Sequence, residues 1–333
     1  MKGVKIRLLI AAILGFTAHG IYADVNVGKP APDMALEFID GSVGSLSEWL
    51  GKKPIYLKVW ATWCSTCRDE MPHFQASYEK YHDDVAVFAV NAGFNDTVPD
   101  VLAFNEQYGL TMPSVIDATG AIGQAFNLTA TPYHILIDSQ GVVVHLGHVA
   151  NDIVDRKLNV IARGASNKPP QRQVKFPIVQ KPDGTAPQPG DKAPAFSIET
   201  LSGDHFTVDS EEKNEEPVYL FFFTVWCESY LGGDGDDETT AKECRETHET
   251  LATAYSKPKH RPNVIGIASR MWTSQQDIVN YQNRVGKSYP LALDKSNETF
   301  QLFGVRRFPT LIVVSNGQVS GRYEGGVTEL PRR

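Results

Sequence analysis

Short apolar runs alternate along this chain with stretches in which apolar residues recur every three or four positions. The runs have the length of buried strands, and the recurring stretches have the spacing of helices that pack by one face. In the first half, strands are expected at 54–60, 85–90, 114–116, 133–138 and 142–147, and helices at 68–81, 101–108, 121–126 and 152–162. In the second half, strands are expected at 218–223, 264–268, 290–293 and 310–314, with a helix at 276–285. This alternation predicts an α/β fold in which each half is a mixed central β-sheet flanked by helices.

An internal repeat relates the two halves. The segment VGKPAPDM at 27–34 recurs as PGDKAPAF at 189–196, and Trp63-Cys64 recurs as Trp226-Cys227. The spacing from Cys67 to Pro132 is 65 positions, and so is the spacing from Cys244 to Pro309. Such self-similarity predicts two copies of one fold in tandem.

Two regions lie outside the repeat. Basic residues at 2, 5 and 7 precede an apolar run at 8–16, and small residues at 18–20 or 21–23 offer a cleavage site. This pattern predicts a signal peptide at 1–23 and a soluble protein exported to the periplasm, although an uncleaved membrane anchor is the alternative. The proline-rich segment 165–188 predicts an extended linker between domains at 24–164 and 189–333.

Charge and cysteine content limit the classes of function that the chain can have. The net charge is -7 and no basic cluster occurs, so nothing indicates nucleic-acid binding. Four cysteines in 333 residues are too few for a disulfide framework. Such sparing use is typical of catalytic or metal-binding cysteines.

Cys64-Ser-Thr-Cys67 lies where the first long strand passes into a helix. The first cysteine is expected to cap that helix, where free backbone amides and the helix dipole stabilise a thiolate. Cys67 is three residues further on, within reach of Cys64, and can resolve a mixed disulfide. The alternatives are a structural disulfide or half of a zinc site, but a zinc site needs about two more ligands and none follows at a suitable spacing.

The Trp-Ala-Thr-Trp-Cys-x-x-Cys motif, a Thr131-Pro132 pair before a strand, and the extra helix and strand between 96 and 116 resemble the TlpA/ResA branch of thioredoxin-like proteins. The resemblance implies two tandem thioredoxin-like domains and an exported thiol–disulfide oxidoreductase that needs no metal or other cofactor. It implies Cys64 as nucleophile, Cys67 as resolving thiol and Trp63 as a shield over the disulfide. Pro132 would be a cis-proline beside the cysteines, and Thr131 would offer its backbone to a substrate. The implied partners are a protein disulfide or dithiol substrate and a membrane thiol carrier as electron donor.

The first half departs from that family at its proton-handling acid. Many members of that family have an acid six residues before the first cysteine, but this chain has Lys58 there. Others have a Glu just after the second strand, but this chain has Phe94 at that position. Lys58 either points inward, where its charge would favour a thiolate, or reaches solvent along its aliphatic stem. Asp69 and Glu70 are expected to be solvated charges on a helix face. His134 is expected to be a partly buried histidine with satisfied hydrogen bonds.

In the second half, sixteen residues (228–243) separate Cys227 from Cys244, where two separate the first pair. The acidic, glycine-rich insert is expected to form a loop at the site itself, which makes this domain a degenerate copy with Pro309 as its matching proline. A structural or regulatory disulfide, an altered redox site, a metal site completed by His248 four residues after Cys244, and free thiols all remain open. Arg306 and Arg307, just before Phe308-Pro309, could pair with the insert, select an acidic partner, or simply be exposed.

The sequence therefore predicts dithiol–disulfide exchange by the first domain, while the second domain binds a partner or regulates the first site. Two functions from other classes remain as alternatives. One is handling of a metal such as copper, or redox maintenance of metal-site cysteines in an exported oxidase. The other is a binding module in which Cys64 has no role.

Overall fold

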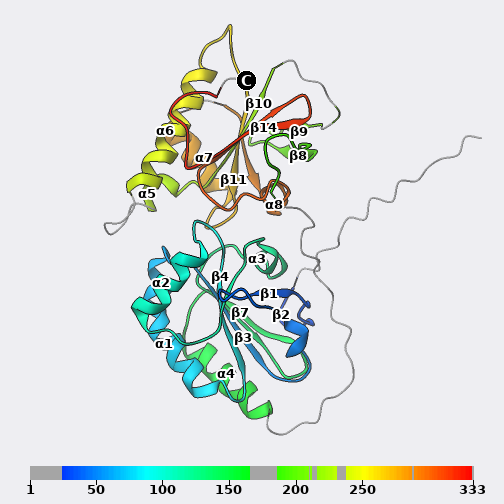
Figure 1. Ribbon diagram of the computed structural model, residues 1–333, viewed down its shortest axis with the longest axis vertical. Coiled ribbons are helices and arrows are strands. Elements are labelled where there is room, and N and C mark those ends of the chain that lie inside the picture. The colour runs from blue at the N-terminus through cyan, green and yellow to red at the C-terminus, as the bar shows by residue number, and fades with distance from the viewer. Residues whose placement is uncertain are drawn as a thin grey trace, which may run out of the picture.

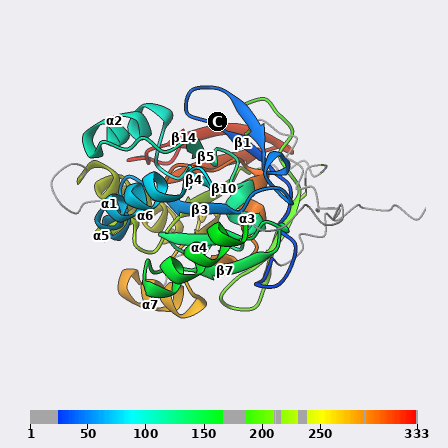
Figure 2. The same ribbon diagram turned by 90° about the horizontal axis from the view of Figure 1, so that it is seen from below.

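The computed structural model describes residues 25–165, 186–209, 211, 216–230, 238–286 and 289–331. These residues form two domains stacked along the long axis of the molecule (Figure 1), and the domains overlap when they are seen along that axis (Figure 2). The predicted signal peptide lies outside the described residues, and so does most of the predicted linker.

The first domain is built on a five-stranded sheet in the order β5-β4-β3-β6-β7. Strands β3, β4 and β5 are parallel to one another, β6 runs antiparallel to β3, and β7 runs antiparallel to β6. Its elements are β1 (Ala35–Glu37), β2 (Val43–Ser45), the 3-10 helix η1 (Leu46–Glu48), β3 (Ile55–Trp60), α1 (Ser65–Tyr81), β4 (Ala86–Asn91), α2 (Val98–Tyr108), β5 (Ser114–Ile116), α3 (Ala121–Ala125), β6 (Tyr133–Ile137), β7 (Val143–Gly147) and α4 (Asp152–Ala165).

The second domain repeats this sheet in the order β12-β11-β10-β13-β14, with the same strand directions. Its elements are β8 (Phe196–Glu199), β9 (His205–Val208), β10 (Val218–Phe223), α5 (Cys227–Tyr230), α6 (Glu238–Tyr255), β11 (Asn263–Ser269), α7 (Gln275–Val285), β12 (Leu291–Asp294), α8 (Glu298–Leu302), β13 (Thr310–Ser315) and β14 (Gln318–Glu324). The predicted tandem of two mixed sheets flanked by helices is confirmed. The two domains differ in that α1 of the first domain is matched by two helices, α5 and α6, in the second domain.

The central strand β3 is buried on both faces, which explains its unbroken apolar run. Alternate side chains point to opposite faces of a strand. Ile55, Leu57 and Val59 pack into one hydrophobic cluster, and Tyr56 and Trp60 pack into another that contains Cys64, Cys67 and helix α1. The lysine between Tyr56 and Trp60 therefore faces the helix that bears the cysteines.

The helix ends differ from the predicted ones because capping residues set them. Helix α1 begins at Ser65, three residues earlier than predicted, since Cys64 caps it. Helix α2 begins at Val98, where Thr97 and Asp100 form a capping box and a proline occupies the first turn. The hairpins β1–β2 and β8–β9 were not predicted from the sequence. Among the described residues, no helix has the length and apolar character needed to cross a membrane.

Candidate functional site

Strand β3 and helix α1 deliver the two cysteines of the first domain. Cys64 is the N-cap of α1, as predicted, and its Sγ accepts a hydrogen bond of 3.2 Å from the backbone N–H of Cys67. The two residues form a disulfide with their Cα atoms 5.2 Å apart. Cys64 is 1% exposed and Cys67 is fully buried. Donation of a backbone amide to Cys64 at a helix N-terminus favours a thiolate there once the disulfide is reduced.

The Thr131-Pro132 peptide bond is cis, and both residues are buried. The carbonyl of Pro132 lies 3.0 Å from Nδ1 of His148. The second domain has a cis bond at the matching Phe308-Pro309. The structure thus has the cis-proline that the family resemblance implied at Pro132, and a second one at Pro309, while the substrate-binding roles of Trp63, Thr131 and Pro132 stay predictions.

A buried ion pair lies on the α1 side of the sheet, and it corrects the prediction for Glu70. Lys58 is fully buried, and its Nζ lies 2.8 Å from Oε2 of Glu70. The same oxygen lies 3.1 Å from Nε2 of His134, and Oε1 accepts the backbone N–H of Ala150. Glu70 is therefore not a solvated charge on the helix face. Asp69 is exposed, as predicted.

The two other members of this network are neutral at pH 7. His134 is buried, with Nδ1 2.8 Å from the hydroxyl of Tyr56, so the predicted satisfied histidine is confirmed. Burial lowers the pKa of His134, although its contact with Glu70 opposes the shift. Burial raises the pKa of Tyr56. Burial also lowers the pKa of Lys58, and Glu70 opposes that shift by holding the cation.

Glu70 should make the stability of the folded protein depend on pH in the acid range. Burial raises its pKa, but contacts with His134 and Lys58 outweigh burial and set the pKa at about 2. A depressed pKa contributes stability that is present above the ordinary value of 4.5 and is lost as the pH falls toward 2. Glu70→Gln is thus expected to lower the urea midpoint more at about pH 7 than at about pH 3. Asp69→Asn is the control, and an equal deficit at both pH values would contradict the assignment.

An acid that the sequence did not single out organises the loop before Cys64. Asp96 accepts the backbone N–H and the hydroxyl of Thr62 and the side-chain amide of Asn91. Burial raises the pKa of Asp96 despite these hydrogen bonds. It follows Phe94 by two residues, and the only signal in the sequence was the cluster of polar residues after an apolar strand.

The second pair of cysteines also forms a disulfide. Cys227 on α5 and Cys244 on α6 are linked with Cα atoms 6.2 Å apart, and they are 1% and 2% exposed. His248 is buried, and its Nδ1 lies 2.7 Å from the hydroxyl of Tyr289. No group of three or more His, Cys, Asp and Glu residues suited to a metal ion occurs in the described parts of the chain. In this state the two sulfurs bind each other rather than a metal.

The two active-site faces lie against each other, which the sequence did not predict. Trp63 stacks on Trp226 with ring centroids 5.3 Å apart, and Trp272 meets both rings edge-on at the same distance. Within the first domain, Trp63 Nε1 donates to the carbonyl of Phe94. Within the second, Trp226 Nε1 donates to the carbonyl of Met271 at the same 2.8 Å. Equivalent residues therefore meet across the interface, as in an isologous dimer.

The loops before the two cis-prolines are engaged by the opposite domain. The N–H of Asn95 donates to the carbonyl of Arg306, three residues before Pro309. The N–H of Trp272 donates to the carbonyl of Thr129, three residues before Pro132. Asn95 and Trp272 occupy equivalent places after β4 and β11, and both have positive φ angles, of 54° and 46°. A backbone twist rare for a tryptophan is thus used to reach the other domain.

Arg306 anchors the contact from the second domain. Its Nε donates to the carbonyl of Ala118 at 2.8 Å and its Nη2 to that of Asp117, while the guanidinium lies 4.6 Å from the ring centroid of Phe94. Burial lowers the pKa of Arg306 to about 10, opposed by the charge of Asp117, so the side chain stays charged at neutral pH. Its role differs from all three that the sequence left open. Arg307 is 53% exposed and lies 4.0 Å from Glu243, the last residue of the insert.

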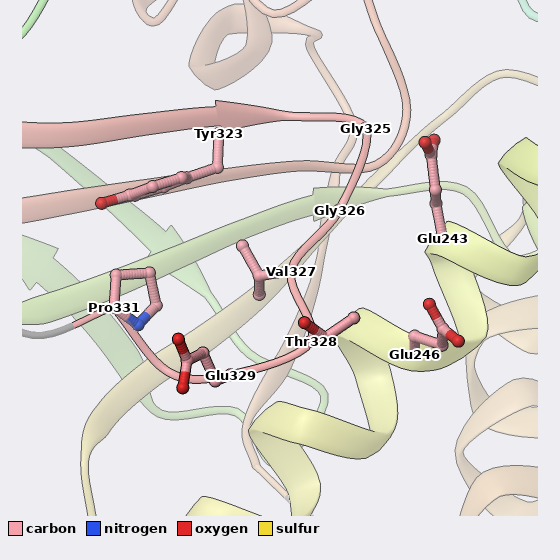
Figure 3. Close-up of a pocket in the computed structure, with 9 residues that line it drawn as sticks. All are labelled: Glu243, Glu246, Tyr323, Gly325, Gly326, Val327, Thr328, Glu329 and Pro331. Carbon is pink, nitrogen blue, oxygen red and sulfur yellow. The ribbon is translucent and has the colours of Figure 1, made fainter.

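A cavity of about 430 Å³ in the second domain is lined by residues of α6 and of the chain from Tyr323 to Pro331, and by no cysteine. Figure 3 shows Glu243 and Glu246 on α6 facing the segment that follows β14, which contributes Glu329. None of the residues predicted for thiol chemistry lines it. Little solvent reaches either disulfide, since all four cysteines are at most 2% exposed.

Comparisons with known proteins agree with this geometry. The Redoxin family profile matches residues 26–161 and again residues 188–331. The thioredoxin-like protein YneN of Bacillus subtilis is 32% identical over 163 residues, 46% of this chain and 95% of the relative. The thiol-disulfide oxidoreductase ResA of Geobacillus kaustophilus is 34% identical over 163 residues, 47% of this chain and 92% of the relative.

Among solved structures, a putative thiol:disulfide interchange protein DsbE from Chlorobium tepidum is 27% identical. The match covers 43% of this chain and 99% of that one, with a TM-score of 0.38. The YneN and ResA relatives each align over a length close to one domain. Since the Redoxin profile matches most of the chain, once in each domain, the chain belongs to the Redoxin family and is a thioredoxin-like thiol–disulfide oxidoreductase.

Proposed function

We propose that this chain exchanges disulfides in exported protein substrates through Cys64 and Cys67. The observation that carries the proposal is the Cys64–Cys67 disulfide at the N-terminus of α1, with Cys64 as the helix cap. Its position supports the role of nucleophile for Cys64, because a capping thiol is the more easily ionised of the two. The relatives named thiol-disulfide oxidoreductases support the same reaction.

The reaction in the reducing direction balances within the two cysteines and the substrate. The Cys64 thiolate attacks one sulfur of a substrate disulfide, forms a mixed disulfide and releases the other substrate sulfur as a thiolate. The Cys67 thiolate then attacks Cys64, which releases the second substrate thiolate and closes the Cys64–Cys67 disulfide. Two electrons have passed to the substrate. A membrane thiol carrier is the proposed donor that reduces the enzyme again.

The second domain is proposed to regulate this site by covering it. Trp226 and Trp272 pack on Trp63, and Trp272 bonds the loop before Pro132, where a substrate chain would lie. A substrate therefore reaches Cys64 when the second domain moves aside. Because the contact uses equivalent residues from both domains, it blocks both cis-proline loops at once.

The metal-handling alternative gains no support from the described residues, where the candidate ligands are engaged otherwise. Cys227 and Cys244 are joined to each other, and Nδ1 of His248 lies against Tyr289. The binding-module alternative differs from the proposal in one result. It expects substitution of Cys64 to leave the biological role unchanged.

Export and exchange can be tested in one experiment on the full chain. Expressed in a bacterium with a periplasm, the protein is expected in the periplasmic fraction with an N-terminus at Ile21 or Asp24, because cleavage follows residue 20 or 23. Equilibrated there with glutathione buffers, the Cys64–Cys67 pair is expected to titrate as a two-electron couple. Retention of residues 1–23 would contradict export, and a pair that never exchanges would contradict the proposed reaction.

A further inference from the structure

The Lys58–Glu70 pair is placed to act on the thiols of the first domain. Lys58 lies between Tyr56 and Trp60 on β3, whose side chains belong to the hydrophobic cluster that contains both cysteines. Its Nζ lies 5.5 Å from the ring centroid of Phe74 on α1. Glu70 is on the same helix, three residues after Cys67, so its side chain emerges one turn from that sulfur. The pair thus lies between the central strand and the helix that presents the disulfide.

The second domain supplies an internal comparison. The residue that matches Lys58, six before Cys227, is Phe221, and the one that matches Glu70, three after Cys244, is Thr247. His134 is matched by Leu311, and the strand registers agree, since Lys58 pairs with His134 as Phe221 pairs with Leu311. The copy whose two cysteines were separated by an insert has thus lost all three groups. The fold itself does not require them, because the second sheet forms with apolar residues in the same places.

Burying an ion pair of this kind costs desolvation free energy that apolar residues would not cost. Two charges taken out of water stabilise a fold weakly at best, and apolar replacements of similar volume are frequently as stable. The second domain has made one such replacement, Phe221 in the place of Lys58, and it has Leu311 in the place of the neutral His134. A chemical role for the pair in the domain with the Cys-x-x-Cys motif accounts for the difference.

We propose that Lys58 stabilises the thiolate form of the Cys64–Cys67 pair and that Glu70 holds Lys58 in place and limits that effect. Both are positioning residues, since their charges act on the thiols without contacting substrate. The proposal rests on the exchange reaction at Cys64 proposed above.

The other titratable groups around the thiols are neutral, exposed, or the same in all the variants compared. They are Tyr56 on β3, His73 on α1, His134 on β6, Asp155 on α4, and Asp96 and Arg68 near Thr62. His134 and Tyr56 are neutral at pH 7, as argued above. His73 and Asp155 are each 47% exposed, so solvent screens their charges. Asp96 and Arg68 stay unchanged in every variant proposed below.

The two single variants are expected to shift the thiols in opposite directions. Lys58→Met leaves an unpaired Glu70 carboxylate one helical turn from Cys67, so the thiol pKa rises and the thiolate fraction at pH 7 falls by about three- to thirtyfold. Glu70→Gln removes the repulsive charge and leaves Lys58 without its carboxylate partner, so the thiolate becomes the group that holds the cation and the thiol pKa falls. A role limited to packing would not produce shifts of opposite sign.

The measurement is the pH dependence of alkylation of Cys64 and Cys67 in the reduced full-length protein, followed for each peptide by mass spectrometry. Asp69→Asn and Lys80→Met are the controls, because they remove the same charges from exposed positions on α1. If Lys58→Met fails to fold, Glu70→Gln is compared with Lys58→Met/Glu70→Gln, which differ only in the cation. The thiol pKa is then expected to be higher in the double variant.

The outcomes separate this proposal from the exchange reaction on which it rests. Equal thiol pKa values in Glu70→Gln and the double variant, or shifts of one sign in both single variants, would overturn the role of the pair. The exchange reaction would survive that result if wild-type Cys64 still reduced a disulfide. A Cys64 that reacts with no disulfide at any pH would instead overturn the reaction itself.

Discussion

Replacing Cys64 by serine is expected to lower the rate of disulfide reduction by at least about a thousandfold, to the background of the reducing buffer. The thiolate is the nucleophile, and a serine hydroxyl at the same helix cap stays protonated at neutral pH. Cys67 is not expected to take over, because it lies within α1 and lacks the N-cap position that favours a thiolate at Cys64. Turbidity from insulin reduced in the presence of a dithiol gives the rate directly.

The matched control uses the equivalent cysteine of the second domain. Cys227→Ser removes a thiol at the same place in the repeat and leaves Cys64 and its cap intact. This variant is expected to keep at least a substantial part of the wild-type rate. Full activity in Cys64→Ser, or its complete loss only in Cys227→Ser, would mean that the working centre is in the second domain.

Arg306→Ala is expected to open the interface and make Cys64 more reactive. The guanidinium donates to two carbonyls of the first domain and packs on Phe94, contacts worth about 2 kcal/mol in the closed form. A loss of about 2 kcal/mol raises the open population roughly thirtyfold wherever the closed form dominates. In the reduced protein, the rate of Cys64 alkylation at fixed pH should rise by a similar factor.

The neighbouring arginine provides a control with the same change of charge. Arg307 is 53% exposed and lies 4.0 Å from Glu243 of its own domain, so Arg307→Ala removes a cation without touching the first domain. Its alkylation rate should equal that of the wild type. Unchanged reactivity in Arg306→Ala would show that the second domain does not limit access to Cys64.

The sequence predicted the elements of each domain well because the relevant information is local. Central strands such as β3 and β10 are continuous apolar runs, and the equal spacing from Cys67 to Pro132 and from Cys244 to Pro309 exposed the repeat. The predicted helix ends were less accurate, because capping residues such as Thr97 determine where a helix begins. The short hairpins β1–β2 and β8–β9 have mixed burial and no clear alternation, so no pattern marked them.

The contact between domains could not be predicted, because each of its residues had a sufficient explanation inside its own domain. Trp63 was expected to shield its own disulfide, and in the structure it also stacks on Trp226. Arg306 precedes a proline loop, and only the folded pair shows that it enters the first domain beside Asp117. Long-range packing of this kind depends on which faces meet, and spacing along the chain does not encode that.

Glu70 was misassigned for a related reason. Its position next to the exposed Asp69 on a helix indicated solvent, and Lys58 twelve residues earlier was considered separately. The two charges meet because β3 runs beneath α1, which places Nζ of Lys58 2.8 Å from Glu70. A lysine in an otherwise apolar strand and an acid one turn after the second cysteine of the motif are a pair that the sequence could have suggested.

Capture of a substrate on the Cys67→Ser variant tests most directly the claim that exchange takes place at Cys64 of a covered site. Without the resolving thiol, the mixed disulfide cannot be released, so a peptide disulfide should remain attached and be located by mass spectrometry. The account predicts an adduct on Cys64, formed faster when Arg306→Ala is added to the same protein. An adduct on Cys227, or none on Cys64 in either protein, would contradict it.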